Sequence, residues 1–246
     1  MRTLVQNCNN LLAAFKSGAL GEIIMPEDIN PGFLDSQSEE RLAYFTLPMA
    51  LNYQRISYKL WESAQKTYLD PTTADVFNVS EAAKMKEEEL RAKLMKYKVA
   101  LQPNKHVQTW HKLAKTIDRE WGSLSAIFLA TEGDFLKLRE IIQKTHKKDF
   151  PYLSGPKIFN YWAYTMTTFG RMPLTNRSFI EIAPDTHVIK GSVLLGVITE
   201  AEAKTISPDA ISLRWRHALA DSGIDPIDIH SPLWFWSRGG FEFKLI

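Results

Sequence analysis

A lysine at the start of a predicted helix is the residue of this chain best suited to chemistry. Lys157 follows the turn-forming residues Ser154, Gly155 and Pro156, and an apolar run from Ile158 onward predicts a helix. The first turn of a helix exposes backbone N–H groups that can bind a phosphate. An amine kept partly uncharged there can act as a nucleophile and form a Schiff base. The stretch therefore indicates covalent chemistry beside a phosphate.

A carboxylate stands at the start of a second predicted helix. Asp185 is followed by Thr186 and His187, an order typical of a helix N-cap. A carboxylate stays ionised near the positive end of a helix. In that state it can stabilise positive charge on a reacting sugar or assist deprotonation of a nucleophile. We expect the polar loop between the two helices to bring Asp185 and Lys157 together.

The composition is that of a globular protein without a strong overall field. The chain has 246 residues, of which 45% are hydrophobic and 24% charged, and its formal net charge is +2 at pH 7. A chain of this length can bury a sizeable core, as one large domain or two smaller lobes. Because the net charge is small, only local clusters of basic residues can indicate a nucleic-acid partner.

The cysteine and histidine content argues against several kinds of site. The single cysteine, Cys8, cannot form a disulfide, a thiolate metal site or an iron–sulfur cluster within one chain. The six histidines are scattered, and the spacing of His106 and His111 puts them on different faces of a helix, so we expect no metal. Residues 1–20 contain no apolar run long enough for a signal peptide or membrane span. The expected location is therefore intracellular, either cytoplasmic and nucleoid-associated or nuclear, with no membrane partner.

Hydrophobic residues recur at helical spacing along most of the chain, which predicts an all-α fold. Pro48 is expected to allow a break or kink in the first long helix, Ser80 to cap another, and Gly122 to end a third. Short strands are possible near Ile24 and at 179–182, too few to build the core. The helices are expected at about 39–68, 80–97, 106–121, 134–145, from 157 onward, at 186–197 and at 208–223.

The order of these motifs resembles that of the helix–hairpin–helix DNA glycosylase superfamily, which has the endonuclease III-like fold. The resemblance covers most of the chain, roughly 39–196. It rests on a glutamine near the end of an early helix, a lysine just before a later helix, a hairpin ending in Gly-x-Lys, and Asp-Thr-His opening a new helix. In this chain these are Gln54, Lys105, Gly155-Pro156-Lys157 and Asp185-Thr186-His187. The last two motifs are the specific ones.

The sequence departs from the family pattern in two places. Leu153 stands where the hairpin usually has its first glycine. The loop from Lys157 to Asp185 is longer than in compact members of the family.

The resemblance implies a two-lobed helical fold with the active-site cleft between the lobes. Residues 1–40 would be an N-terminal segment that packs on the second lobe, residues 41–170 a helical lobe with the helix–hairpin–helix near 134–165, and residues 171–246 the rest of the second lobe. The implied activity is excision of a damaged base from double-stranded DNA, with Lys157 and Asp185 as the catalytic residues. The lysine Schiff base would also support cleavage at the abasic site. No cofactor is needed, and a monomer is expected.

The C-terminal region suggests which base is removed. Residues Pro226 to Trp234 are similar to the tail of archaeal 8-oxoguanine glycosylases, in which an acidic residue four positions before the tryptophan helps to bind the base; here that residue is His230. We expect an oxidised purine such as 8-oxoguanine, held between Tyr161, His230 and Trp234. Tyr161 lies one helical turn beyond Lys157, on the same face. Packing in the core is the alternative role for these aromatic residues.

Other side chains are expected to contact the DNA. An extruded base leaves a gap in the duplex that polar side chains can fill. A hairpin can bind phosphate through its backbone N–H groups, and a basic run just before it can contact the DNA backbone. The expected DNA contacts are Gln54, Arg55, Lys147, Lys148, Ser154, Gly155 and His187. The alternative for the charged members is an ordinary solvated helix face.

Two other functions remain open at this point. A glycosidase of the same fold could act on another base or on a free nucleoside. A non-enzymatic helix–hairpin–helix protein could bind DNA through the hairpin alone, and Lys157 would then be an ordinary solvated lysine.

Overall fold

The computed structural model describes residues 2–21, 31–33, 39–53 and 55–245. The chain divides into two compact units: unit 1 combines Met1–Ile23 with Asn176–Ile246, and unit 2 is Ile24–Thr175. The described residues form helices and no β-strand, which confirms the all-α fold class. None of the helices in these ranges is long and apolar enough to cross a membrane.

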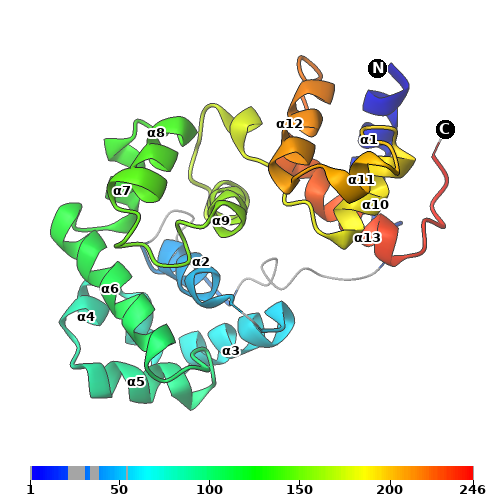
Figure 1. Cartoon of the computed structure of the whole chain (residues 1–246). Helices are drawn as coiled ribbons and strands as arrows, with labels where there is room; N and C mark the ends of the chain where they lie inside the picture. The colour runs from blue at the N-terminus through cyan, green and yellow to red at the C-terminus, as the bar shows by residue number, and fades with distance from the viewer. Residues whose placement is uncertain (1, 22–30, 34–38, 54, 246) are drawn as a thin grey trace. The chain divides into compact units, whose positions relative to one another are not determined.

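Unit 2 is built around one buried helix, α2 (Figure 1). Its elements are α2 (Glu39–Leu51), α3 (Ser57–Leu69), η2 (Ala74–Phe77), α4 (Val79–Lys84), α5 (Glu87–Lys96), α6 (Lys105–Glu120), α7 (Leu124–Ala130), α8 (Phe135–Glu140), η3 (Ile141–Thr145) and α9 (Pro156–Thr168). Helix α2 packs against α3, α6, α7 and α9. Every residue from Arg41 to Leu51 is buried, as expected for a helix surrounded by others.

The expected break at Pro48 does not occur. Pro48 lies inside α2, which continues to Leu51. Proline removes one backbone hydrogen bond and crowds the preceding turn. Packing on all sides of α2 outweighs that local cost, so the helix continues past Pro48 to Leu51.

Helix α9 is held against α2 by a buried hydrogen bond. The indole N–H of Trp162 donates to the hydroxyl of Thr46 at 3.0 Å, and Thr46 donates to the carbonyl of Leu42 at 2.7 Å. Both Trp162 and Thr46 are 0% exposed. The opposite side of α9, at its first turn, is left exposed at Pro156 and Lys157.

Two other local predictions are wrong. Asn78, not Ser80, caps α4, because its side chain accepts a hydrogen bond from the N–H of Glu81, while Ser80 donates to Asp118. The predicted strand at 179–182 is absent, since Arg177–Phe179 forms the 3-10 helix η4. The strand expected near Ile24 lies outside the described residues. Gly122 does end α6 as expected, with φ of 78° and its N–H bonded to Ile117.

Unit 1 contains one continuous hydrophobic core. Its elements are α1 (Arg2–Lys16), η4 (Arg177–Phe179), α10 (Thr186–Leu194), α11 (Glu202–Thr205), α12 (Pro208–Ala218), η5 (Pro226–Ile229) and α13 (His230–Arg238). Helix α1 packs on α13, so the N-terminal helix shares a core with the C-terminal part of the chain (Figure 1). Ser207 caps α12 as predicted, accepting a hydrogen bond from the N–H of Ala210 at 3.2 Å.

A glycine allows α10 and α13 to approach closely. A Cβ atom at Gly191 would lie 2.8 Å from Cδ2 of Leu233. On another side of α10, the indole of Trp215 donates to the hydroxyl of Ser192 at 2.8 Å. These contacts fix α10 relative to α13 and α12 within unit 1.

The hydrogen bond between Trp162 and Thr46 yields a stability prediction. Thr46→Val preserves shape but leaves the buried indole N–H without an acceptor, so the free energy of unfolding should fall by about 1–3 kcal/mol. Thr165→Val is the matched control: Thr165 is also fully buried, but its hydroxyl donates only to the carbonyl of Tyr161. Urea unfolding should show the larger loss for Thr46→Val. Equal losses would mean that the bond does not hold α9.

Candidate active site and nucleic-acid interface

The segment 146–155 forms a tight turn between η3 and α9. The side-chain amide of Gln143 donates to the carbonyl of Ser154 at 3.1 Å, and the hydroxyl of Ser154 donates to the carbonyl of Lys147 at 3.1 Å. Phe150 and Leu153 are 0% exposed and anchor the turn in the core. These hydrogen bonds and buried side chains hold the segment 146–155, which we call the hairpin, in place.

The left-handed residue of the hairpin is Tyr152, with φ of 62°. Leu153, which stands where the family has a glycine, instead fills a buried position. Gly155 is needed for a different reason, since a Cβ there would lie 3.1 Å from the carbonyl oxygen of Tyr152. The hairpin thus tolerates Leu153 because its backbone reverses one residue earlier.

The N–H groups available to an anion are not those of Ser154 and Gly155, which the sequence suggested. The N–H of Ser154 donates to Phe150 and that of Gly155 to Tyr152, both at 2.9 Å. Pro156, the first residue of α9, has no N–H, and Gly155 as N-cap offers no side chain. The N–H groups of Lys157 and Ile158 donate to no described residue. These two are the open donors of the hairpin.

Lys157 lies in the first turn of α9, exposed and without an ion-pair partner among the described residues. A positive charge at a helix N-terminus is unfavourable with respect to the helix dipole. The arrangement leaves the amine able to meet an incoming anion.

Asp185 caps α10 as predicted. Its Oδ1 atom accepts hydrogen bonds from the N–H groups of His187 and Val188, each at 2.9 Å. Its Oδ2 atom accepts none from the described residues, and the side chain is half-buried. Oδ1 therefore caps α10, while Oδ2 remains available for another hydrogen bond.

Aromatic and basic side chains surround the start of α10 within unit 1. The His187 ring meets the edge of Trp234 with centroids 5.2 Å apart, and its Nδ1 is 3.0 Å from the hydroxyl of Ser237. The guanidinium of Arg238 lies 5.0 Å from the centroid of Trp234. Ser237 and Arg238 were not expected at this site from the sequence, although their helical spacing from Trp234 could have indicated them.

The other expected pocket residues are partly buried. Tyr161 is half-buried in α9, with its ring 5.7 Å from that of Tyr164. His230 is half-buried at the start of α13, one turn before Trp234. Trp162 and Trp236, by contrast, are core residues, at 0% and 6% exposed.

The expected site residues fall into two groups. Lys157, Tyr161 and the hairpin belong to unit 2. Asp185, His187, His230 and Trp234 belong to unit 1. There the N–H of His187 donates to the Asp185 carboxylate, and Trp234 contacts the His187 ring. The pairing of Lys157 with Asp185 stays a prediction.

Arg55 has a structural contact that the sequence did not reveal. Its two terminal nitrogens donate to the carbonyls of Val99 and Lys98, at 2.6 and 2.9 Å, and burial lowers its pKa from the usual value. Filling the gap left by an extruded base would require these bonds to break, so that role stays a prediction. Gln54 lies outside the described residues.

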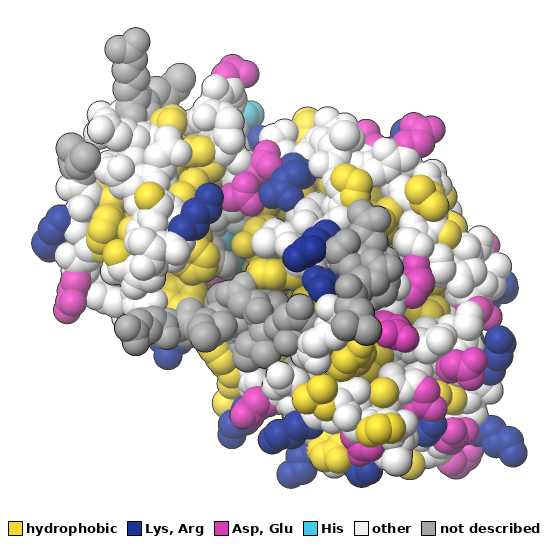
Figure 2. Space-filling view, turned by 180° about the vertical axis from the view of Figure 1, so that it is seen from behind, with side chains coloured by type: hydrophobic (Ala, Val, Ile, Leu, Met, Phe, Trp, Pro, Cys, Tyr) yellow, Lys and Arg dark blue, Asp and Glu magenta, His cyan; other side chains and the backbone are white. Residues whose placement is uncertain are grey.

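The basic run before the hairpin divides into paired and unpaired lysines. Lys137 and Lys144 form ion pairs with Glu132 and Glu140. Lys147 and Lys148 are exposed and form none with the described residues. Elsewhere, basic and acidic side chains are intermixed over the face drawn in Figure 2. Two exposed lysines that pair with no described carboxylate, Lys147 and Lys148, therefore lie next to the hairpin.

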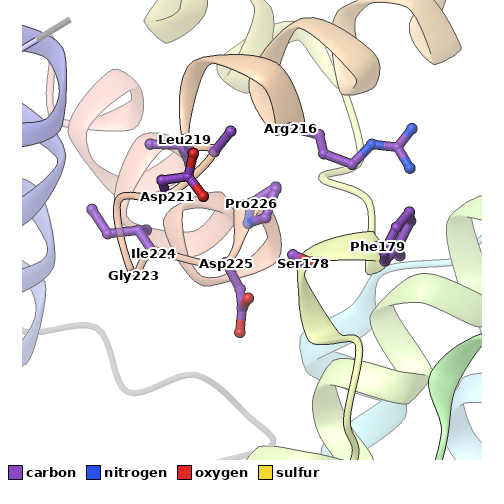
Figure 3. A pocket seen from close by; sticks show the side chains of 10 residues that line it. Ser178, Phe179, Arg216, Leu219, Asp221, Gly223, Ile224, Asp225 and Pro226 are labelled. Atoms are coloured by element: carbon purple, nitrogen blue, oxygen red, sulfur yellow. The ribbon is translucent and has the colours of Figure 1, made fainter.

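A pocket of about 350 Å³ lies in unit 1 but contains none of the expected site residues (Figure 3). Its wall includes Phe179 and Arg216, whose guanidinium lies 5.2 Å from the phenyl centroid and 3.8 Å from Glu181. The aliphatic residues Leu219 and Ile224 form part of its lining. Ser178 and Asp225 also line it, but no hydrogen bond joins the Ser178 hydroxyl to a proton acceptor among the described residues.

Comparison of the chain with known protein families, with characterised proteins and with solved structures finds no match. Within the ranges that the structure describes, no three histidine, cysteine, aspartate or glutamate side chains gather in a way that could hold a metal ion. The site must therefore be judged on the geometry of its own residues.

The cap at Asp185 allows folding to be separated from chemistry. Asp185→Ala removes the acceptor for two N–H groups and should lower the free energy of unfolding by about 0.5–2 kcal/mol, whereas Asp185→Asn keeps an acceptor and should lose less. Thermal and urea unfolding of both variants would measure this. An unchanged free energy of unfolding for Asp185→Ala would show that the cap contributes little to stability.

Proposed function

We propose that this chain is a DNA glycosylase of the helix–hairpin–helix type, with a two-lobed fold, that excises a damaged base and then cleaves the abasic site. The observation that carries the proposal is Lys157. It is an exposed lysine that pairs with no described carboxylate, it lies beside two open N–H groups, and it directly follows a hairpin. These features fit an amine that meets a sugar–phosphate backbone.

In this proposal the hairpin binds a phosphate next to the lesion. The N–H groups of Lys157 and Ile158 donate to the phosphate oxygens, and Lys147 and Lys148 add charge. Ser154 and Gly155 then serve by shaping the turn, since their own N–H groups are already bonded. Phosphate contacts position the protein, and they contribute no base specificity.

The chemical steps follow from an amine and a carboxylate. Nζ of Lys157 forms a bond to C1′ of the sugar as the bond from C1′ to the base breaks, and the base leaves with the electron pair. The nitrogen loses its proton, and the sugar ring opens to give the Schiff base. Loss of a proton from C2′ then expels the 3′ phosphate by β-elimination. Asp185 supports these steps by stabilising positive charge on the sugar and by accepting or returning the proton.

The proposed substrate is an oxidised purine such as 8-oxoguanine in duplex DNA. Tyr161 and Trp234 supply aromatic faces, and His230 supplies a polar group where related tails have an acid. A panel of duplexes that differ only in the damaged base would identify the preferred substrate and would also reveal activity on another base.

A DNA-binding protein without catalysis is the second candidate. The exposure of Lys157 supports it, because no buried surroundings among the described residues activate this amine as a nucleophile. In that case Lys157 would contribute to affinity alone.

Borohydride trapping separates these candidates. The wild-type chain incubated with lesion-bearing duplex and borohydride should form a covalent adduct, and Lys157→Gln should abolish the adduct because the amine is gone. Lys147→Gln is the matched control, since it removes an equally exposed, unpaired lysine of the same hairpin. An adduct that survives Lys157→Gln would assign the Schiff base elsewhere, and no adduct with any lesion would favour the non-catalytic protein.

Asp185→Asn tests the carboxylate. Base excision should fall by about 10²-fold or more, the scale of a lost acid–base or electrostatic contribution. Affinity for lesion DNA should stay the same or rise, because a negative charge near phosphates is removed. Single-turnover excision and equilibrium binding would be compared with the wild type. Unchanged excision would exclude Asp185 from the reaction.

A further inference from the structure

A lysine outside the hairpin is held between two tyrosines. Tyr53, in the turn after α2, stacks on Tyr152 of the hairpin, with ring centroids 4.9 Å apart and planes at 28°. Nζ of Lys105, the first residue of α6, lies 5.1 Å from the centroid of Tyr53 and 5.2 Å from that of Tyr152. All three residues belong to unit 2, so their arrangement depends on one compact body.

The charge of Lys105 is not compensated. Lys105 is exposed and forms no ion pair with a residue that the structure describes, whereas Lys112 on the same helix pairs with Asp149 at 3.4 Å. At the first position of α6, a positive charge opposes the helix dipole. Burial lowers the pKa of the neighbouring His106, and the positive charges of Arg55 and Lys105 lower it further.

Helix α6 lies along the hairpin, with Lys105 at one end of the contact. Trp121, just after α6, meets the ring of His146 with centroids 5.0 Å apart, Lys112 pairs with Asp149, and Lys105 reaches Tyr152. The carbonyl of Tyr152 in turn accepts the hydrogen bond from Gly155, at the start of α9. Lys105 therefore adjoins the same turn that presents Lys157.

We propose that Lys105, oriented by Tyr53 and Tyr152, binds a phosphate of the nucleic-acid backbone, and that this backbone runs from the first turn of α9 past the hairpin to the start of α6. The inference rests on the proposed function for the identity of the partner, DNA. Four exposed lysines without described ion pairs would follow this line: Lys105, Lys147, Lys148 and Lys157. A series of unpaired cations along one turn matches the spaced charges of a polyanion rather than a single carboxylate.

The tyrosines have a separate part in this arrangement. Their rings attract the ammonium group and limit its conformations, so less freedom is lost when a phosphate binds. Lys105 supplies the charge, and Tyr53 and Tyr152 act as positioning residues. Removing the charge should therefore change the salt dependence of binding, whereas removing a ring should change only the affinity.

Binding of undamaged duplex DNA, measured by fluorescence anisotropy over a range of salt concentrations, tests the inference. Lys105→Gln should reduce the slope of log K against log salt by about 0.9, because one fewer counterion is released. Lys105→Arg should retain the slope. Tyr53→Leu should retain the slope as well, but weaken binding about 2- to 5-fold at every salt concentration, since a cation–π contact is lost while the charge stays.

Lys112→Gln is the matched control, since Lys112 is on the same helix but is already paired with Asp149; its slope should equal that of the wild type. A wild-type slope for Lys105→Gln would overturn the inference. The wild type is also tested for borohydride trapping: a reduced slope for Lys105→Gln without any adduct would leave the phosphate contact standing and refute the glycosylase. Wild-type protein that binds no duplex would refute both.

Discussion

The hydrogen bond from Trp162 to Thr46 fixes the helix on which the candidate chemistry depends. Trp162 and Thr46 are fully buried, and α2 around Thr46 is surrounded by helices. A buried indole N–H is costly to leave unbonded, so the face of α9 that carries Trp162 is tied to the core. The first turn of α9 is then left outside, and the orientation of Lys157 follows from how the other side of its helix is buried.

The hairpin before α9 leaves hydrogen-bond donors and lysines exposed beside Lys157. Its own polar groups are used internally, through Gln143, Ser154 and Gly155, so the turn is rigid before any ligand binds. The groups left over are the N–H donors of Lys157 and Ile158 and several lysines without ion pairs. Placing cations at the positive ends of α6 and α9 costs stability. Such a cost is typical of functional sites, where local rules are broken for the sake of a partner.

The two carboxylate oxygens of Asp185 differ in their hydrogen bonding. One of its oxygens completes the hydrogen bonding of α10, and the other stays available. The close approach at Gly191 sets α10 against α13, which brings Trp234 to His187. The Asp185 carboxylate and the rings of His187 and Trp234 are thereby positioned by one core, even though Trp234 is distant in sequence.

Local structure could be predicted from the sequence. Helical spacing predicted the all-α class, and the capping residues Asp185 and Ser207 and the terminating Gly122 act as expected, because each interacts within its own turn. Tertiary structure decided what depends on distant neighbours. Because α2 is buried on all sides, it continues past Pro48. The hydroxyl of Ser80 donates to Asp118 instead of capping α4. The carbonyls of Lys98 and Val99 hold Arg55, and the stacked rings of Tyr53 and Tyr152 hold Lys105. No local pattern encodes these contacts, because they join segments that only the packing of helices brings together.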